Sequence, residues 1–392
     1  MKRKFFGVAL ALAGLANGQM VAATVQSSEP ILATEAGAAY KPQDSDERGL
    51  WMQVDEEERR IKTSNFLVRD AALNAYVRDV FCRTVGPECA SIRIYILRTP
   101  YFNASMAPNG MMQIWSGLFL RLHDEAQLAA ILGHEYVHFK NQHSLKLFRA
   151  ARSKSGSATF MSMFGLLGSL IALGQLASVF EFSRDMESEA DRQSLQLMTH
   201  GGYQPESAAR IWQQLRAEQD ATAAARQTKS RKDKNGGIFA THPPTAERLA
   251  ALKALAASTP ADPSRIIGRE RYRAALSSAW PSLIDDQIKM NDLGATEFLI
   301  NQLAEEGWTA GLSYARGEML RARGRPEDLA AAELSYRAAI ADPVAPPEAW
   351  RGLGLTLLRS SKADEGKVQL KAYLDRKPDA SDRAIIAMMA GA

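Results

Sequence analysis

The most constraining feature of this sequence is the run His134-Glu-Tyr-Val-His138, whose two histidines can act together only inside a helix. Positions i and i+4 of a helix lie on one face, so both imidazoles can reach one metal ion, and Glu135 is placed to activate a water molecule. Asp124 and Gln127 form a variant of a capping box, which predicts that a helix opens at Asp124 and contains the run. The alternative for this pattern alone is a helix with two surface histidines.

A second predicted helix, near residues 180–199, supplies the third protein ligand that a catalytic zinc site needs beside an open position. Glu187 and Asp191 share one face of it, and the small Ala190 lets the two helices approach. Asp191 is then placed to accept the far N–H of a ligand histidine and fix its tautomer. Glu189 points away and is interpreted as a solvated charge. Three other histidines are interpreted as surface or capping residues, namely His123, His143 and His200.

These residues together resemble a family of zinc metallopeptidases, peptidase family M48, which includes the CAAX prenyl endopeptidases, HtpX and BepA. The resemblance covers about residues 50–255 and rests on three motifs: His134-Glu-x-x-His138, Glu187-x-x-Ala190-Asp191, and Thr241-His242-Pro243-Pro244 with Arg248. It implies a gluzincin-like domain, mostly α-helical with a small β-sheet. It also implies one zinc ion per chain, bound by His134, His138 and Glu187. Glu135 would be the general base, with His242 and Arg248 near the scissile carbonyl.

The segment Asn103-Ala104-Ser105-Met106, followed by Gly110 and a strand, is similar to the segment where this family places its substrate-binding edge. Alternating apolar and polar residues predict strands at 91–97 and 111–116. An extended substrate would add its backbone to the edge at 103–106 or at 111–116. We therefore expect cleavage of unfolded or locally extended segments.

His242 follows a glycine-ended loop and precedes two prolines, so a hinge could carry it toward or away from the metal. The resemblance to the BepA branch suggests that a resting His242 occupies the fourth metal position as a latch. The alternatives are that it only stabilises the oxyanion beside Arg248, or that it closes a structural zinc site.

The first 23 residues have the three parts of a secretory signal: a basic start, an apolar run at 5–15 and small residues at 21–23. Cleavage is expected after Ala23, with Gly18 as the alternative. Three of the 48 basic side chains lie at positions 2–4, so 45 remain against 44 acidic ones after cleavage. This balance argues against a nucleic-acid partner. We expect a periplasmic protein, which could also associate with the membrane.

Cys82 and Cys89 flank a Gly86-Pro87 turn and are the two cysteines of the sequence. In an oxidising compartment a close pair predicts a disulfide, with two buried thiols as the alternative. A zinc ribbon would need four ligands at paired spacing, which the sequence does not offer.

Residues 158–180 carry no charge and are long enough to span a bilayer. One crossing would put His134 and Glu187 on opposite sides of about 30 Å of hydrocarbon, where they could not share a metal ion. We interpret the stretch as an apolar lid or an interfacial helix in peripheral contact with the membrane. A buried core helix is the alternative.

The C-terminal third predicts tetratricopeptide-like helical repeats, because large and small residues recur at the spacing of that repeat. One copy comprises Trp350, Leu353, Gly354, Leu357, Gly366, Leu370, Tyr373 and Pro378, and a looser copy Gly317, Leu320, Ala332, Tyr336 and Pro343. Helices near 280–308 would complete the stack, and a plain helical bundle is the alternative. The predicted domains are a signal peptide (1–23), a leader (24–46), the peptidase (47–258), a connecting helical region (259–290) and the repeats (291–392).

The sequence thus predicts a periplasmic zinc endopeptidase that cleaves unfolded or misassembled envelope proteins, including outer-membrane proteins. Its repeats would bind a client or the envelope assembly machinery. The alternative is a chaperone-like scaffold of envelope protein assembly with a latent metal site. Glu135 favours the enzyme, because a scaffold has no need of a base beside two ligands.

Overall fold

A computed structural model describes residues 41–154, 183–230, 246–305 and 307–391. The signal peptide, most of the leader, the uncharged stretch 158–180 and His242 lie outside these ranges. Within the described ranges, no helix combines the length and the apolar character needed to cross a membrane.

The N-terminal part of the described chain is built on a three-stranded sheet in the order β1-β3-β2, formed by Arg93–Leu97, Met111–Trp115 and Ala104–Met106 respectively. Strand β3 pairs with β1 in parallel and with β2 antiparallel. It is therefore the central strand, and the expectation that 111–116 could serve as an open edge was wrong. Strand β2, from the predicted segment 103–106, does lie at an edge of the sheet.

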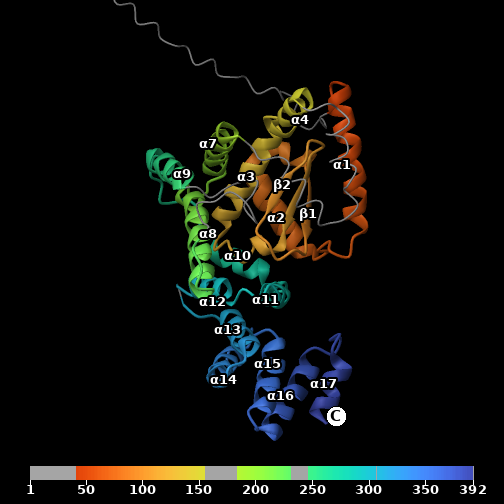
Figure 1. The fold of residues 1–392 in the computed structure, drawn as a ribbon, viewed down its shortest axis with the longest axis vertical. Helices are drawn as coiled ribbons and strands as arrows, with labels where there is room; N and C mark the ends of the chain where they lie inside the picture. Colours follow the sequence, from red (N-terminus) through yellow and green to blue (C-terminus); the bar gives the residue numbers. More distant parts are fainter. Residues whose placement is uncertain (1–40, 155–182, 231–245, 306, 392) are drawn as a thin grey trace, which may run out of the picture.

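Helices α2 (Ala71–Val85), α3 (Glu125–Lys140) and α7 (Arg184–His200) pack together beside this sheet (Figure 1). The predicted start of α3 is confirmed: Asp124 accepts from the backbone N–H of Gln127, and the Gln127 side chain accepts from the N–H of His123. Helices α3 and α7 approach closely because the contact is made by small residues. A Cβ on Gly133 would lie 3.5 Å from that of Ser194 on α7.

Helix α1 (Ser45–Thr63) lies along the sheet and is joined to it by Glu58, whose side chain is 5% exposed. Glu58 Oε1 accepts from Arg93 Nε at 2.6 Å and from the Tyr95 hydroxyl at 2.7 Å, and both partners belong to β1. Burial acts to raise the pKa of Glu58, but the hydrogen bonds from Arg93 and Tyr95 outweigh it and lower the pKa to about 2. The ionised carboxylate therefore stabilises the contact between α1 and the sheet.

We expect Glu58→Gln to lower the free energy of unfolding by about 1–3 kcal/mol at pH 7, because Arg93 and Tyr95 lose a charged acceptor. The folded pKa lies below the unfolded one, so this stabilisation is present above pH 4.5 and is lost as the pH falls toward about 2. Urea unfolding at pH 7 and pH 3 measures it, with the exposed Glu56→Gln as control. An equal difference between native chain and variant at both pH values would contradict this prediction.

The predicted disulfide is present: the sulfur atoms of Cys82 and Cys89 are bonded at 2.08 Å. Cys82 belongs to the last turns of α2, and Cys89 lies in the 3-10 helix Gly86–Ser91 that leads into β1. The bond therefore fixes the connection from α2 into the sheet.

Further helices pack around α3 and α7 and extend the chain away from the sheet (Figure 1). These are α4 (His143–Lys154), α8 (Glu206–Ala225), α9 (Ala246–Ser258), α10 (Arg269–Leu276), α11 (Trp280–Lys289) and α12 (Leu293–Leu303). Helix α12 meets the end of α8, since a Cβ on Gly294 would come within 2.4 Å of Ala225 Cβ. Asp292 also pairs with Arg226 at 3.0 Å. Helix α12 therefore joins the C-terminal helices to α8, which packs against α3.

The C-terminal helices form two successive pairs, followed by one further helix, at the far end of the molecule (Figure 1). They are α13 (Ala310–Arg323), α14 (Pro326–Ile340), α15 (Glu348–Arg359), α16 (Ala363–Arg376) and α17 (Arg383–Ala390). Each pair is closed by a glycine under a large residue: a Cβ would lie 2.7 Å from the Tyr336 ring at Gly317, and 2.6 Å from Leu370 at Gly354. The predicted pairing of large and small residues is present, and its assignment to tetratricopeptide repeats stays a prediction.

Candidate metal centre

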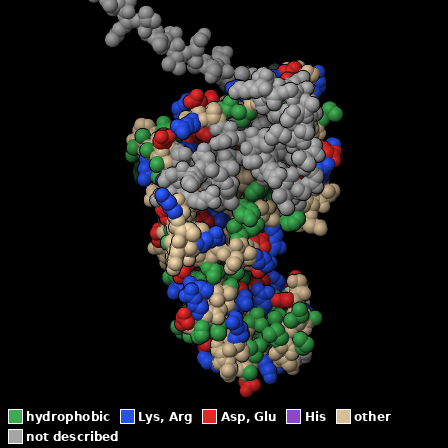
Figure 2. Space-filling model, in the orientation of Figure 1, with side chains coloured by type: hydrophobic (Ala, Val, Ile, Leu, Met, Phe, Trp, Pro, Cys, Tyr) green, Lys and Arg blue, Asp and Glu red, His purple; other side chains and the backbone are tan. Residues whose placement is uncertain are grey.

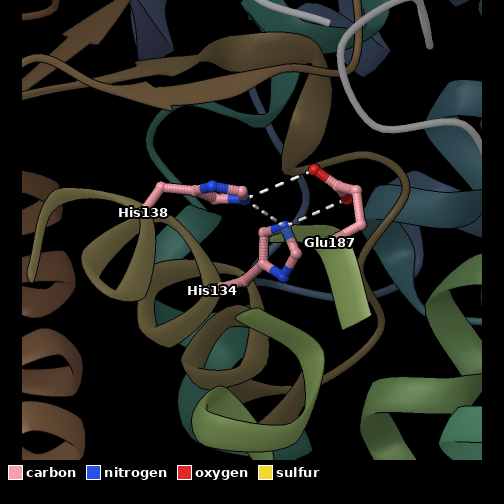
Figure 3. A group of neighbouring side chains, drawn as sticks. All are labelled: His134, His138 and Glu187. Carbon is pink, nitrogen blue, oxygen red and sulfur yellow. Dashed lines mark hydrogen bonds and ion pairs between the residues drawn. The ribbon is translucent and has the colours of Figure 1, made fainter. Parts of the chain in front are cut away.

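The side chains of His134, His138 and Glu187 converge between α3 and α7 (Figure 3). The Nε2 atoms of the two histidines are 3.1 Å apart. The Glu187 oxygens lie 3.5 Å from His134 Nε2 and 3.4 Å from His138 Nε2. All three residues are buried, with His134 3% and His138 1% exposed, so the alternative of two surface histidines was wrong.

This cluster suits a metal ion. Its three ligand atoms lie within 4.8 Å of one another, close enough to share one ion. Two imidazole nitrogens and one carboxylate oxygen are the protein ligands of a common class of catalytic zinc site, which keeps a further position open. The donor set and its burial therefore fit the predicted zinc ion.

Asp191 lies beside His134, with its Oδ1 3.1 Å from Nδ1 of that ring. Burial acts to raise the pKa of Asp191, but Arg248 and His134 lower it to about 2. Desolvation and Arg248 act to lower the pKa of His134, yet hydrogen bonds to Asp191 and Glu187 outweigh them and raise it. The carboxylate of Asp191 is thus ionised and able to fix the His134 ring.

Arg248 comes to the site from α9 and is 8% exposed. It donates to both oxygens of Asp191 at 2.7 Å and lies 2.8 Å from Glu187 Oε2. Its guanidinium also stacks on the ring of Trp212 at 3.9 Å. These contacts fix the two carboxylates relative to each other. The proposed contact with a scissile carbonyl stays a prediction.

Glu135 lies on the helix that carries both histidines, and the edge strand β2 packs against that helix. Glu135 is 3% exposed and follows the ligand His134 on α3. Helix α3 also packs against β2, where Ala104 and Met106 are buried and Ser105 is partly exposed. Asn103, just before the strand, accepts a backbone hydrogen bond from Trp115 at 3.0 Å. The predicted substrate edge therefore lies beside the helix that carries the predicted base.

His143 is buried, although the sequence suggested a place on the surface or at a cap, and that prediction was wrong. It is fully buried, and its Nδ1 lies 2.9 Å from Nδ1 of His138. On a continuous helix a residue five positions on would face away from His138. Helix α3 instead ends at Lys140, and Gln142, with φ of 53°, turns the chain so that α4 begins with His143 beside His138.

Glu189 takes part in this contact, because its Oε2 lies 3.3 Å from Nε2 of His143 and its side chain is 30% exposed. It is therefore more than the solvated charge that the sequence suggested. Of the other histidines, His200 is exposed and lies 2.8 Å from the Gln196 carbonyl near the end of α7, as expected of a capping residue. His123 is partly buried beside Gln214, and burial lowers its pKa to about 4.

The part of the chain that contains this cluster matches a known protein family. Residues 68–256 match the family model described as Peptidase family M48. This part of the chain is a peptidase M48 domain. The matched range contains all three motifs on which the sequence resemblance rests, and it confirms that resemblance.

Curated relatives of the chain are proteases of mitochondria and bacteria. Mitochondrial metalloendopeptidase OMA1 of Schizosaccharomyces pombe is 30% identical over 152 residues, which is 36% of this chain and 44% of the relative. The beta-barrel assembly-enhancing protease of Escherichia coli is 26% identical over 223 residues, 51% of this chain and 44% of the relative. Mitochondrial OMA1 of Bos taurus is 29% identical over 169 residues, 38% and 31% respectively. The chain thus spans less than half the length of these relatives.

Proposed function

We propose that this chain is a periplasmic zinc-dependent endopeptidase that cleaves unfolded or misassembled envelope proteins. The observation that carries the proposal is the convergence of His134, His138 and Glu187 beside Glu135, inside the part of the chain that matches a peptidase family. A metal site without catalysis would need the three ligands but not an adjacent carboxylate on the same helix.

Each side chain of the site has a separate role in this proposal. A zinc ion held by His134, His138 and Glu187 would polarise a peptide carbonyl and lower the pKa of water. Glu135 accepts a proton from the attacking water and returns it to the leaving amine. Asp191 holds the ring of His134 through Nδ1, and Arg248 holds Asp191 and Glu187.

The substrate class follows from the sheet. Strand β2 lies at an edge and can pair with an extended backbone, whereas β3 is paired on both sides. A folded substrate would first have to release a segment of similar length. We therefore propose that unfolded or misassembled proteins are the preferred substrates.

An envelope location is supported by three observations. The sequence begins with the features of a secretory signal, the structure contains a disulfide, and one relative is named for β-barrel assembly. The uncharged segment 158–180 is proposed as a peripheral membrane contact on its sequence alone. To test the substrates, envelope proteins are compared in cells that express the native chain or Glu135→Gln. Substrates should accumulate with the variant, and identical protein profiles would contradict the proposal.

Partner binding is proposed for the C-terminal helices. They carry exposed apolar side chains at Val368 on α16 and at Ile385 and Met388 on α17, each at least 60% exposed. Figure 2 shows hydrophobic side chains gathered over this end of the molecule. The same surface favours the second candidate, a scaffold of envelope assembly with a latent metal site. Cleavage of an unfolded polypeptide by the purified chain distinguishes the two.

His242→Ala should raise basal proteolysis or self-cleavage if His242 is a latch on the open metal position. If His242 only stabilises the oxyanion, the same change should lower kcat with zinc retained. We propose the latch. The measurement is turnover of an unfolded polypeptide by zinc-loaded variant and native chain, with exposed His200→Ala as the matched control. Reduced turnover with intact zinc content would refute the latch.

A further inference from the structure

A chain of three buried or partly buried side chains runs outward from the metal centre through three helices. His138 belongs to α3, His143 begins α4 and Glu189 belongs to α7. The Nδ1 atoms of the two histidines are 2.9 Å apart, and Nε2 of His143 is 3.3 Å from Glu189 Oε2. The other oxygen of Glu189 accepts a hydrogen bond from Gln193 at 3.0 Å, which orients the carboxylate.

With a metal ion bound at Nε2 of His138, the contacts assign the proton positions along this chain. His138 directs Nε2 toward His134 and Glu187, so Nε2 is the atom available to a metal ion. A ring nitrogen that binds a metal carries no proton, so a neutral His138 carries its proton on Nδ1 and donates it to His143. Because Nδ1 of His143 accepts, its own proton lies on Nε2 and is donated to the Glu189 carboxylate.

We propose that His143 and Glu189 are positioning residues, which hold His138 in the tautomer and ring orientation that bind the metal. The inference rests on the proposed function in taking the ion to be zinc. Each ligand histidine would then be connected, through its Nδ1 atom, to a carboxylate of α7 that is not itself a metal ligand. His134 reaches Asp191 directly at 3.1 Å, whereas His138 reaches Glu189 through His143.

The positions of the carboxylates around α7 explain why His138 needs a second imidazole to reach Glu189. Residues two positions apart on a helix are about 200° apart around its axis, so Glu189 faces away from Glu187 and Asp191. The turn at Gln142 brings His143 to the side of α7 on which Glu189 lies. The imidazole of His143 therefore lies between His138 and Glu189 and connects them through its two ring nitrogens. Loss of such partners typically weakens metal binding by roughly 10- to 100-fold.

The test measures zinc dissociation constants of full-length chains by competition with a chelating dye. His143→Leu keeps similar volume but neither accepts nor donates a hydrogen bond. His143→Asn retains an acceptor, Oδ1, near the position of Nδ1. Glu189→Gln removes the charge at the outer end of the chain. His200→Leu, at an exposed histidine of α7, is the matched control.

We expect His143→Leu to weaken zinc binding roughly 10- to 100-fold and His143→Asn to restore affinity to within about threefold of the native value. Glu189→Gln should weaken binding several-fold in the native chain and add little in the His143→Leu background. His200→Leu should have no effect. If His143 only packed, zinc affinity would depend on the volume of its replacement. A zinc affinity that depends on the acceptor atom therefore distinguishes positioning from packing.

Equal affinities for the Leu and Asn variants would assign His143 to packing and overturn the proposal. If neither His143 variant folds, Glu189→Gln decides alone, and an unchanged zinc affinity in it would overturn the proposal. These are binding measurements, so they are independent of peptidase activity. A native chain that binds zinc but cleaves no polypeptide would refute the proposed function and leave this inference standing.

Discussion

Glu135→Gln is expected to lower the rate of polypeptide cleavage by roughly 10²- to 10⁴-fold, the contribution typical of a positioned general base. The glutamine amide has nearly the same shape as the carboxylate but cannot take a proton from water. His134, His138 and Glu187 are unchanged in the variant, so it should bind as much zinc as the native chain. Steady-state cleavage of an unfolded fluorescent polypeptide and elemental analysis of the same sample measure both properties.

The matched control for this prediction is Glu56→Gln, the same substitution at a half-exposed position on α1. It should leave cleavage and zinc content unchanged. If the Glu135 variant keeps full activity with one zinc ion per chain, another group is the base and the proposed mechanism is wrong. If it loses its zinc, the loss of activity no longer reports on Glu135 as a base.

Glu187→Ala is expected to remove zinc from the purified protein, with an affinity loss larger than the roughly 100-fold upper range for outer partners of a metal site. Glu187 supplies the one oxygen among the three converging ligand atoms, and two imidazoles alone hold zinc weakly. Cleavage should be lost with the metal. Elemental analysis and competition with a chelating dye give the zinc content and affinity.

Thermal unfolding of the metal-free protein shows whether the Glu187→Ala variant has lost only a metal ligand or has also lost its fold. Arg248 retains both hydrogen bonds to Asp191 when Glu187 is shortened, so the metal-free variant should still fold. Glu206→Ala at the start of α8 is a control on a neighbouring helix. A folded Glu187→Ala chain that retains one zinc ion would show that Glu187 is not a ligand.

The side chains that converge at the metal centre could be predicted because their positions depend on local helix geometry. The capping residues Asp124 and Gln127 indicate where α3 begins, and i, i+4 spacing then puts His134 and His138 on one face. The same spacing pairs Glu187 with Asp191 on α7. No knowledge of how the two helices pack was needed to choose these side chains. The small residues at the helix contact, Gly133 and Ser194, agree with that choice, and Ala190 is buried.

The contact between His143 and His138 could not be predicted, because it depends on a change of chain direction between α3 and α4. Counted along a continuous helix, His143 faces away from His138, and only the turn at Gln142 reverses this. A positive φ at glutamine has no sequence signal comparable to glycine. The position of β3 was missed for a similar reason. Its parallel pairing with β1 joins segments separated by a loop and β2, which alternation along one strand does not reveal.

The central claim is that cleavage depends on a zinc ion held by His134, His138 and Glu187, and removal and return of the metal tests it most directly. The purified chain is stripped with a chelator, and cleavage of an unfolded polypeptide is measured before and after titration with zinc. We predict that activity disappears with the metal and returns to its original level at one zinc ion per chain. Undiminished cleavage by metal-free protein, or a fully zinc-loaded chain that cleaves nothing, would contradict the claim.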